Sequence, residues 1–284
     1  MAILGAHMSI AGGYYKAVEA AKRCGCDCVQ LFTKNNNQWR AKPILEEEAA
    51  RFRGALKELA IRHPIAHNSY LINLASPDDA LWRRGIEAFV VELQRAEQLG
   101  LAYVVTHPGA SLASGEQQGL LRVAAAIDEI HAQTKRIRAR ILLETTAGQG
   151  TCLGCRFEHL AEIISRARNP ERLGVCVDTC HIFAAGYPLA TVRQYRATMK
   201  HLAAIVGLEQ VKAFHLNDSK RELGSRVDRH AHIGQGHLGL EPFRHLLNDA
   251  RFERVPMYLE TPKGTSAGEE LDVINLRTLR GLIE

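Results

Sequence analysis

Residues 141–146 read ILLETT, an apolar run that ends in a glutamate and two threonines. Seven other short runs pass from apolar to polar residues in the same way: AILGAH (2–7), CVQLFT (28–33), PIAHNS (64–69), AYVVTH (102–107), GVCVDT (174–179), VKAFHL (211–216) and PMYLET (256–261). Runs rich in valine, isoleucine, leucine and phenylalanine are typical of strands buried on both faces of a parallel sheet. The sequence therefore predicts eight such strands.

The stretches between these runs place apolar residues at three-to-four spacing, which is typical of amphipathic helices. The clearest cover residues 45–60, 80–100, 119–135 and 157–168. Strand-then-helix units repeated eight times in 284 residues match the size of a (β/α)8 TIM barrel, an α/β fold. A doubly wound open sheet is the alternative. No linker-like or low-complexity segment interrupts the sequence, so we expect a single domain over residues 1–284.

Composition is that of an ordinary globular protein, with 46% hydrophobic and 24% charged residues. The formal net charge of +5 permits an anionic partner such as nucleic acid but does not require one. We expect no signal peptide and no membrane helix, because the sequence lacks the apolar runs that either would need. The 7 cysteines are scattered in apolar contexts, which favours reduced thiols in a cytoplasmic protein. The CxxC pair Cys152 and Cys155 indicates a structural zinc only weakly.

Metal-binding residue types stand where six consecutive predicted strands end. They are His67, His107, Glu144, Asp178, His215 and Glu260, and His181 follows three residues after Asp178. In a parallel barrel these ends converge on one mouth, where such enzymes keep their active sites. Each residue alone could be a simple helix cap, but crowded carboxylates repel one another unless cations lie between them. Mixed histidine and carboxylate ligands suit Zn²⁺, with Mn²⁺ or Fe²⁺ also possible.

The segment DRHAHIGQGHLG (228–239) lies in an irregular stretch between the seventh and eighth strands, and long irregular loops are usually functional. It adds Asp228 and His230 as candidate ligands. In extended backbone Asp228, His230 and His232 all point one way, so spacing alone does not choose between the two histidines. A single zinc usually takes three or four protein ligands, so this many candidates indicates several ions. Multi-metal sites suit phosphoryl chemistry, which predicts a metallohydrolase acting on phosphate esters.

Nearly the whole sequence resembles endonuclease IV, the zinc-dependent apurinic/apyrimidinic (AP) endonuclease family of DNA base excision repair. The resemblance rests on nine segments in the same order: GAHMSIAGG (5–13), LFTKNNNQW (31–39), AHNSYLINLA (66–75), THPG (106–109), LLETTAGQG (142–150), GVCVDTCHIFAAGY (174–187), FHLNDSK (214–220), DRHAHIGQGHLG (228–239) and LETPKG (259–264). It implies a TIM barrel that binds double-stranded DNA containing abasic sites as a monomer. It also implies hydrolysis of the phosphodiester 5′ to the lesion, which leaves a 3′-hydroxyl and a 5′-deoxyribose phosphate.

The resemblance further implies three zinc ions, with Mn²⁺ possible in place of some. The implied ligand sets are His67, His107 and Glu144 for the first ion; Glu144, Asp178, His215 and Glu260 for the second; and His181, Asp228 and His230 for the third. Glu144 would bridge two ions, so it is the residue on which we expect catalysis to depend most. No protein side chain would act as the nucleophile.

Four residues are implied to contact DNA. Tyr70 and Leu71 match family residues that wedge into the base stack, and Lys34 would attract phosphate. Asn37 stands where well-known members carry an arginine that inserts into DNA, so part of this wedge differs in the present chain.

Two other functions are compatible with a barrel of this kind. A metal-dependent sugar isomerase or epimerase shares the fold, but it needs fewer ligands than this sequence offers. A non-catalytic protein that binds damaged DNA would have no use for a complete set of metal ligands.

Overall fold

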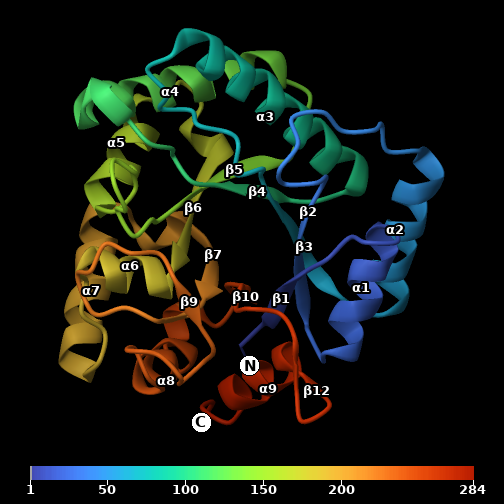
Figure 1. The fold of residues 1–284 in the computed structure, drawn as a ribbon, viewed down its shortest axis with the longest axis vertical. Helices are drawn as coiled ribbons and strands as arrows, with labels where there is room; N and C mark the ends of the chain where they lie inside the picture. The colour runs from blue at the N-terminus through green and yellow to red at the C-terminus, as the bar shows by residue number, and fades with distance from the viewer. Residues whose placement is uncertain (1) are drawn as a thin grey trace.

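A closed barrel of eight parallel strands forms the centre of the computed structural model, which describes residues 2–284 (Figure 1). Its strands are β1 (Leu4–Met8), β2 (Cys28–Phe32), β3 (Arg62–His67), β4 (Tyr103–Thr106), β5 (Arg140–Glu144), β6 (Leu173–Asp178), β7 (Val211–Leu216) and β10 (Met257–Leu259). The ring closes because β1 pairs with both β2 and β10. The predicted TIM barrel is confirmed, and each predicted strand has its counterpart.

Helices surround the barrel on all sides (Figure 1). They are α1 (Tyr14–Arg23), α2 (Glu46–Glu58), α3 (Asp79–Leu99), α4 (Glu116–Gln133), α5 (Phe157–Arg166), α6 (Thr179–Ala185), α7 (Val192–Ile205), α8 (Glu241–Leu247) and α9 (Leu271–Arg280), with 3-10 turns at Leu112–Ser114, Pro170–Arg172, Leu208–Gln210 and Ala250–Phe252. The boundaries follow local chemistry. In α3 the Asp78 carboxylate accepts a hydrogen bond from the Leu81 N–H, and Gly100 ends the helix with φ 75°.

Side chains fill the middle of the barrel, one from each of seven strands: Cys28, Ile65, Val105, Leu142, Cys176, Ala213 and Tyr258. A larger apolar core lies between the strands and the helices. Because the interior is packed with side chains, we expect a functional site at the loops and strand ends and not inside the barrel. No helix within residues 2–284 combines the length and apolar character needed to cross a lipid bilayer.

The stretch between β7 and β10 begins with a two-stranded antiparallel pair, β8 (Asp218–Ser219) and β9 (His230–Ala231). The Asp218 carboxylate accepts hydrogen bonds from the N–H groups of Gly236 (3.0 Å) and Leu238 (2.9 Å), which holds the following turn. A second small pair, β11 (Thr265–Ser266) and β12 (Glu269–Glu270), precedes α9. The predicted irregular loop therefore has a fixed shape, and it brings residues 228–230 over the barrel mouth.

Candidate metal centre

The C-terminal ends of the barrel strands bring the predicted ligands together, and the first group surrounds Glu144 at the end of β5. The Glu144 Oε2 atom lies 3.1 Å from Nε2 of His67 and 3.0 Å from Nε2 of His107. The Glu144 side chain is fully buried, whereas His107 is 35% exposed. One ligand atom from each residue falls within 4.8 Å of the others, so these three residues could hold one ion.

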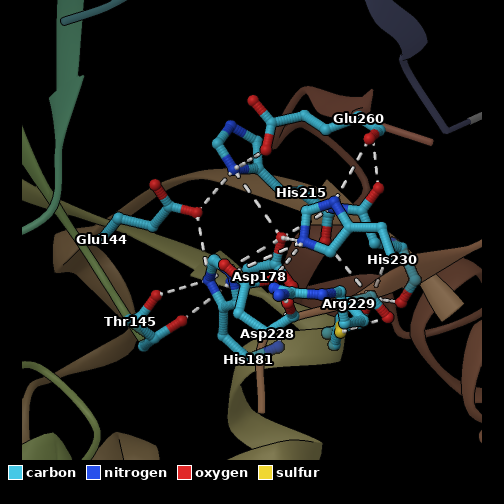
Figure 2. Close-up of polar contacts among 12 residues, drawn as sticks. Glu144, Thr145, Asp178, His181, His215, Asp228, Arg229, His230 and Glu260 are labelled. Carbon is cyan, nitrogen blue, oxygen red and sulfur yellow. Dashed lines mark hydrogen bonds and ion pairs between the residues drawn. The ribbon is translucent and has the colours of Figure 1, made fainter. Parts of the chain in front are cut away.

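The second group shares Glu144 and lies deeper in the mouth. Nδ1 of His215 is 2.8 Å from Glu144 Oε1, 3.2 Å from Glu260 Oε2 and 3.9 Å from Asp178 Oδ2. Figure 2 shows these four side chains pointing toward one another from β5, β6, β7 and the end of β10. They also satisfy the spacing of a common metal site.

The third group joins the β8–β9 region to the start of α6. The two carboxylate oxygens of Asp228 lie 3.1 Å from Nε2 of His181 and 3.2 Å from Nε2 of His230 (Figure 2). The two Nε2 atoms are themselves only 3.4 Å apart. Two imidazole nitrogens and a carboxylate converging on one point are the donor set expected around a cation.

Hydrogen bonds outside the cluster fix the orientation of four of the histidines. Nδ1 of His67 lies 2.9 Å from the Asn68 carbonyl oxygen, and Nδ1 of His181 lies 2.8 Å from the Thr145 carbonyl oxygen. Nδ1 of His230 lies 3.2 Å from the Glu260 carbonyl oxygen, and Nε2 of His215 lies 2.8 Å from Oε1 of Gln30. A nitrogen that donates to an oxygen outside leaves the other nitrogen with a lone pair directed into the cluster. This is the usual arrangement around metal-ligating histidines.

The charges of the cluster also fit cations. Burial raises the pKa of Glu144, but the imidazoles of His215 and His107 outweigh burial and hold that pKa well below its ordinary value. Burial lowers the pKa of His181, yet the carboxylates of Asp178 and Asp228 raise it well above the ordinary value. The carboxylates thus attract positive charge strongly, and either protonated imidazoles or bound metal ions would supply it.

Comparison with known proteins places this chain in a family. Residues 18–277 match the family described as xylose isomerase-like TIM barrel. The probable endonuclease 4 of Chloroflexus aggregans is 54% identical over 279 residues, which are 98% of this chain and 97% of that protein. The probable endonuclease 4 of Citrifermentans bemidjiense is 47% identical over 284 residues, covering 100% of both chains. The chain belongs to the endonuclease IV family.

Solved structures agree with membership of the endonuclease IV family. The crystal structure of endonuclease IV from Thermus thermophilus matches with a TM-score of 0.87 and 36% identity, covering 98% of both chains. A D-tagatose 3-epimerase-like protein matches with a TM-score of 0.72 but only 17% identity. The second likeness shows a shared barrel fold alone.

The four residues expected to contact DNA fall in two loops at the mouth. Tyr70 is 63% exposed, and its ring packs edge-on against Phe32 at a centroid distance of 5.5 Å. Leu71 is half-buried beside it, and Asn37 is exposed in the loop after β2. The Ser69 hydroxyl donates to the Asn36 carbonyl oxygen at 2.5 Å, so the two loops touch.

The environment of Lys34 argues against its predicted contact with phosphate. Its ammonium group is buried, lies 3.2 Å from Oε1 of Glu92 and donates to the Gln38 carbonyl oxygen at 2.8 Å. An ammonium group enclosed and paired in this way is not available to a phosphate. Lysine next to a strand end resembles a surface residue in sequence, but the partner carboxylate comes from α3, far along the chain.

The structure also separates the histidines of the 228–239 segment. His232 accepts a hydrogen bond from Nδ2 of Asn275 at 3.1 Å, whereas His230 faces His181 and Asp228. Cys180 lies near Asp228 and His230 as well, but burial raises its thiol pKa to about 12, which disfavours the thiolate that binds metals. Cys152 and Cys155 are free thiols and fall in no metal-binding group among residues 2–284.

Gln30 is the residue that sequence analysis missed. It is fully buried on β2, and its Nε2 donates to Glu260 Oε1 at 2.5 Å and to His7 Nδ1 at 3.0 Å. Its Oε1 accepts the hydrogen bond that sets the tautomer of His215. The signal was present, since glutamine in the middle of the apolar run CVQLF needs buried polar partners.

Replacing Gln30 by methionine should therefore weaken metal retention about tenfold or more, because hydrogen-bond partners of metal ligands typically change metal affinity by that amount. The measurement is metal content by mass spectrometry after dialysis against graded concentrations of chelator. Gln118→Met, at an exposed position of α4, is the control. Equal retention in both variants would show that Gln30 does not orient His215.

Proposed function

We propose that this chain is an AP endonuclease that hydrolyses the phosphodiester 5′ to abasic sites in double-stranded DNA, leaving a 3′-hydroxyl and a 5′-deoxyribose phosphate. The observation that carries the proposal is the convergence of nine family-matched side chains at one barrel mouth. Two of the implied ligand sets have the spacing of a common metal site, and in the third Asp228 lies within 3.2 Å of both His181 and His230. The proposal includes three Zn²⁺ ions, with Mn²⁺ possible in place of some, bound to a monomer in the reducing cytoplasm. Its free cysteines suit that compartment.

Bound divalent cations supply Lewis-acid activation of water and phosphate and stabilise the oxygen that leaves. The protein groups make this possible by holding those cations. Without cations, the carboxylates of Glu144, Asp178, Asp228 and Glu260 would repel a phosphate, so they cannot bind DNA by themselves. Glu144 belongs to both the first and the second group, so it would hold two ions from one strand end.

A pocket of about 290 Å³ opens beside the cluster between His107, Gln149 and Arg229. Its size suits a single sugar-phosphate unit, and a nucleotide that lacks its base costs little to turn out of the duplex. The backbone carbonyl of Asp228 accepts a hydrogen bond from the Arg229 guanidinium at 2.6 Å, which keeps this cation at the rim. We infer that the abasic deoxyribose enters here, next to the first and third groups.

Incubation with a duplex that carries one abasic-site analogue tests the proposed function against the alternatives. The expected product is a nick 5′ to the lesion with a 3′-hydroxyl end. A mobility shift without a nick would favour a damaged-DNA binding protein. Neither a shift nor a nick would favour a sugar isomerase or epimerase, a function that the 17% identity to a D-tagatose 3-epimerase-like protein does not itself support.

Replacing Tyr70 by alanine should weaken binding of the abasic duplex about tenfold, because stacking of a base on an aromatic ring is worth roughly 1–3 kcal/mol. Fluorescence anisotropy with a labelled duplex measures this affinity. Tyr70→Phe keeps the ring and should bind nearly as well as the unaltered protein. If alanine and phenylalanine variants bind alike, the ring does not stack on DNA.

A further inference from the structure

The loop that joins β2 to α2, residues 33–45, contains neither helix nor strand. It runs along the edge of the barrel as the blue segment between β2 and α2 in Figure 1, and it carries the exposed Asn37. Under the proposed function this loop must press against DNA. An irregular segment can do so only if its shape is held before DNA arrives, because ordering a loop on binding weakens affinity.

One buried arginine joins the two ends of this loop. Arg95 of α3 donates from Nη2 to the Thr33 carbonyl oxygen and from Nη1 to the Lys42 carbonyl oxygen, each at 2.7 Å. The same guanidinium donates to the Tyr14 hydroxyl at 2.7 Å, and Tyr14 in turn donates to the Thr33 carbonyl oxygen. A planar group with several fixed donors is suited to holding separate backbone carbonyls in one geometry.

A buried glutamate fixes the first half of the loop. Oε2 of Glu92 accepts a hydrogen bond from the Thr33 hydroxyl at 2.5 Å, and its Oε1 lies 3.2 Å from the Lys34 ammonium. Lys34 continues the chain of contacts by donating to the Gln38 carbonyl oxygen. Glu92 and Arg95 stand three residues apart on α3 and so face the same side of that helix.

We propose that Glu92 and Arg95 are positioning residues that hold the loop 33–45 in the shape required for DNA binding. The role in DNA binding rests on the proposed function, whereas the role in holding the shape of the loop does not. Burying charged side chains disfavours folding unless they are fully compensated, and apolar residues would pack α3 more simply. Here the compensation comes largely from loop atoms, so the buried charges specify the course of that loop.

The test compares Arg95→Met and Glu92→Gln with Arg83→Met, which makes the same arginine change at an exposed position of α3. Two readouts are used: trypsin cleavage after Arg40, and affinity for an abasic-analogue duplex in single-turnover incision. Lys42 is followed by Pro43 and resists trypsin, and Lys34 is buried, so Arg40 is the exposed trypsin site that reports on the loop. Zinc content and the incision rate at saturating enzyme are recorded alongside.

Arg95→Met should be cleaved after Arg40 at least about tenfold faster and should bind the duplex about tenfold less tightly, since the loop must then be ordered on binding. Its zinc content should not change, and its incision rate at saturation should stay within about threefold, because the metal groups are untouched. Arg83→Met should behave as the unaltered protein. Glu92→Gln should show the same changes to a smaller degree. It provides the test of the inference if Arg95→Met fails to fold.

Protection of Arg40 and unchanged affinity in both loop variants would overturn the inference. An equal fall in zinc content and in incision at saturation would also overturn it, because that pattern indicates general damage to the barrel. If the unaltered protein does not incise abasic DNA, the proposed function fails, while trypsin cleavage still decides whether Glu92 and Arg95 hold the loop.

Discussion

Glu144→Gln should lower the rate of DNA incision about a thousandfold or more, since metal-ion chemistry supplies several kcal/mol and each 1.36 kcal/mol is tenfold in rate. Glutamine has nearly the same shape but carries no charge. The change removes the carboxylate that lies within 3.1 Å of His67, His107 and His215, so it weakens two metal-binding groups together. Single-turnover incision of the abasic-analogue duplex measures the loss.

The same variant should keep its fold, because the site lies at the strand ends and the packed interior layer is unchanged. Circular dichroism and the thermal midpoint check this point. Glu87→Gln, at an exposed position of α3, is the matched control and should incise normally. Incision by Glu144→Gln at a rate near that of the control would show that Glu144 does not bridge two ions.

His230→Ala should lose one of the three proposed metal ions and should slow incision about a hundredfold or more, a cost comparable to removing one group that stabilises a leaving oxygen. Nε2 of His230 lies 3.2 Å from Asp228 and 3.4 Å from Nε2 of His181, so alanine leaves the third group with two residues. The first and second groups contain no atom of His230 and should keep their ions.

His232→Ala is the control, because the same change is made two residues away. His232 is hydrogen-bonded to Asn275 and lies outside the metal-binding groups found within residues 2–284. It should retain its metal content and most of its activity. The reverse outcome, with metal lost from His232→Ala and kept in His230→Ala, would contradict the ligand assignment. Metal content by mass spectrometry and single-turnover incision decide between the two.

Most of the fold, and the convergence of the candidate ligands, could be predicted because the sequence changes from apolar to polar residues where each strand ends. Buried parallel strands need continuous apolar runs, and a polar side chain can follow only where the strand reaches the barrel mouth. Glu144, Asp178 and His215 stand at that transition. The structure confirms the barrel and brings these residues together, although metal ligation by them stays a prediction.

The choice between His230 and His232 could not be made from strand alternation. Alternation holds only while the backbone stays extended, and β9 ends at Ala231. The N–H of Gln235 then donates to the His232 carbonyl oxygen, which closes a turn and carries His232 away toward Asn275. Which histidine faces Asp228 therefore depends on where a two-residue strand ends. Alternation does not predict this, and the preference for His230 came from the family resemblance.

The environments of Lys34 and Gln30 depend on residues far along the chain. Lys34 pairs with Glu92 of α3. Gln30 forms hydrogen bonds with Glu260 at the end of β10 and with His215 of β7. Local sequence shows only that a polar group follows or interrupts a strand. Which partner it meets is decided by barrel closure, so the burial of Lys34 was not foreseen and the role of Gln30 was missed.

The proposed centre contains three metal ions held by nine side chains. The measurement that tests it most directly is the ratio of zinc plus manganese to protein, by mass spectrometry, for protein purified without chelator. With three or four protein ligands per ion, the three groups predict a stable ratio of about three per chain. A stable ratio of one, in protein that nicks DNA 5′ to an abasic site at full rate, would contradict the account.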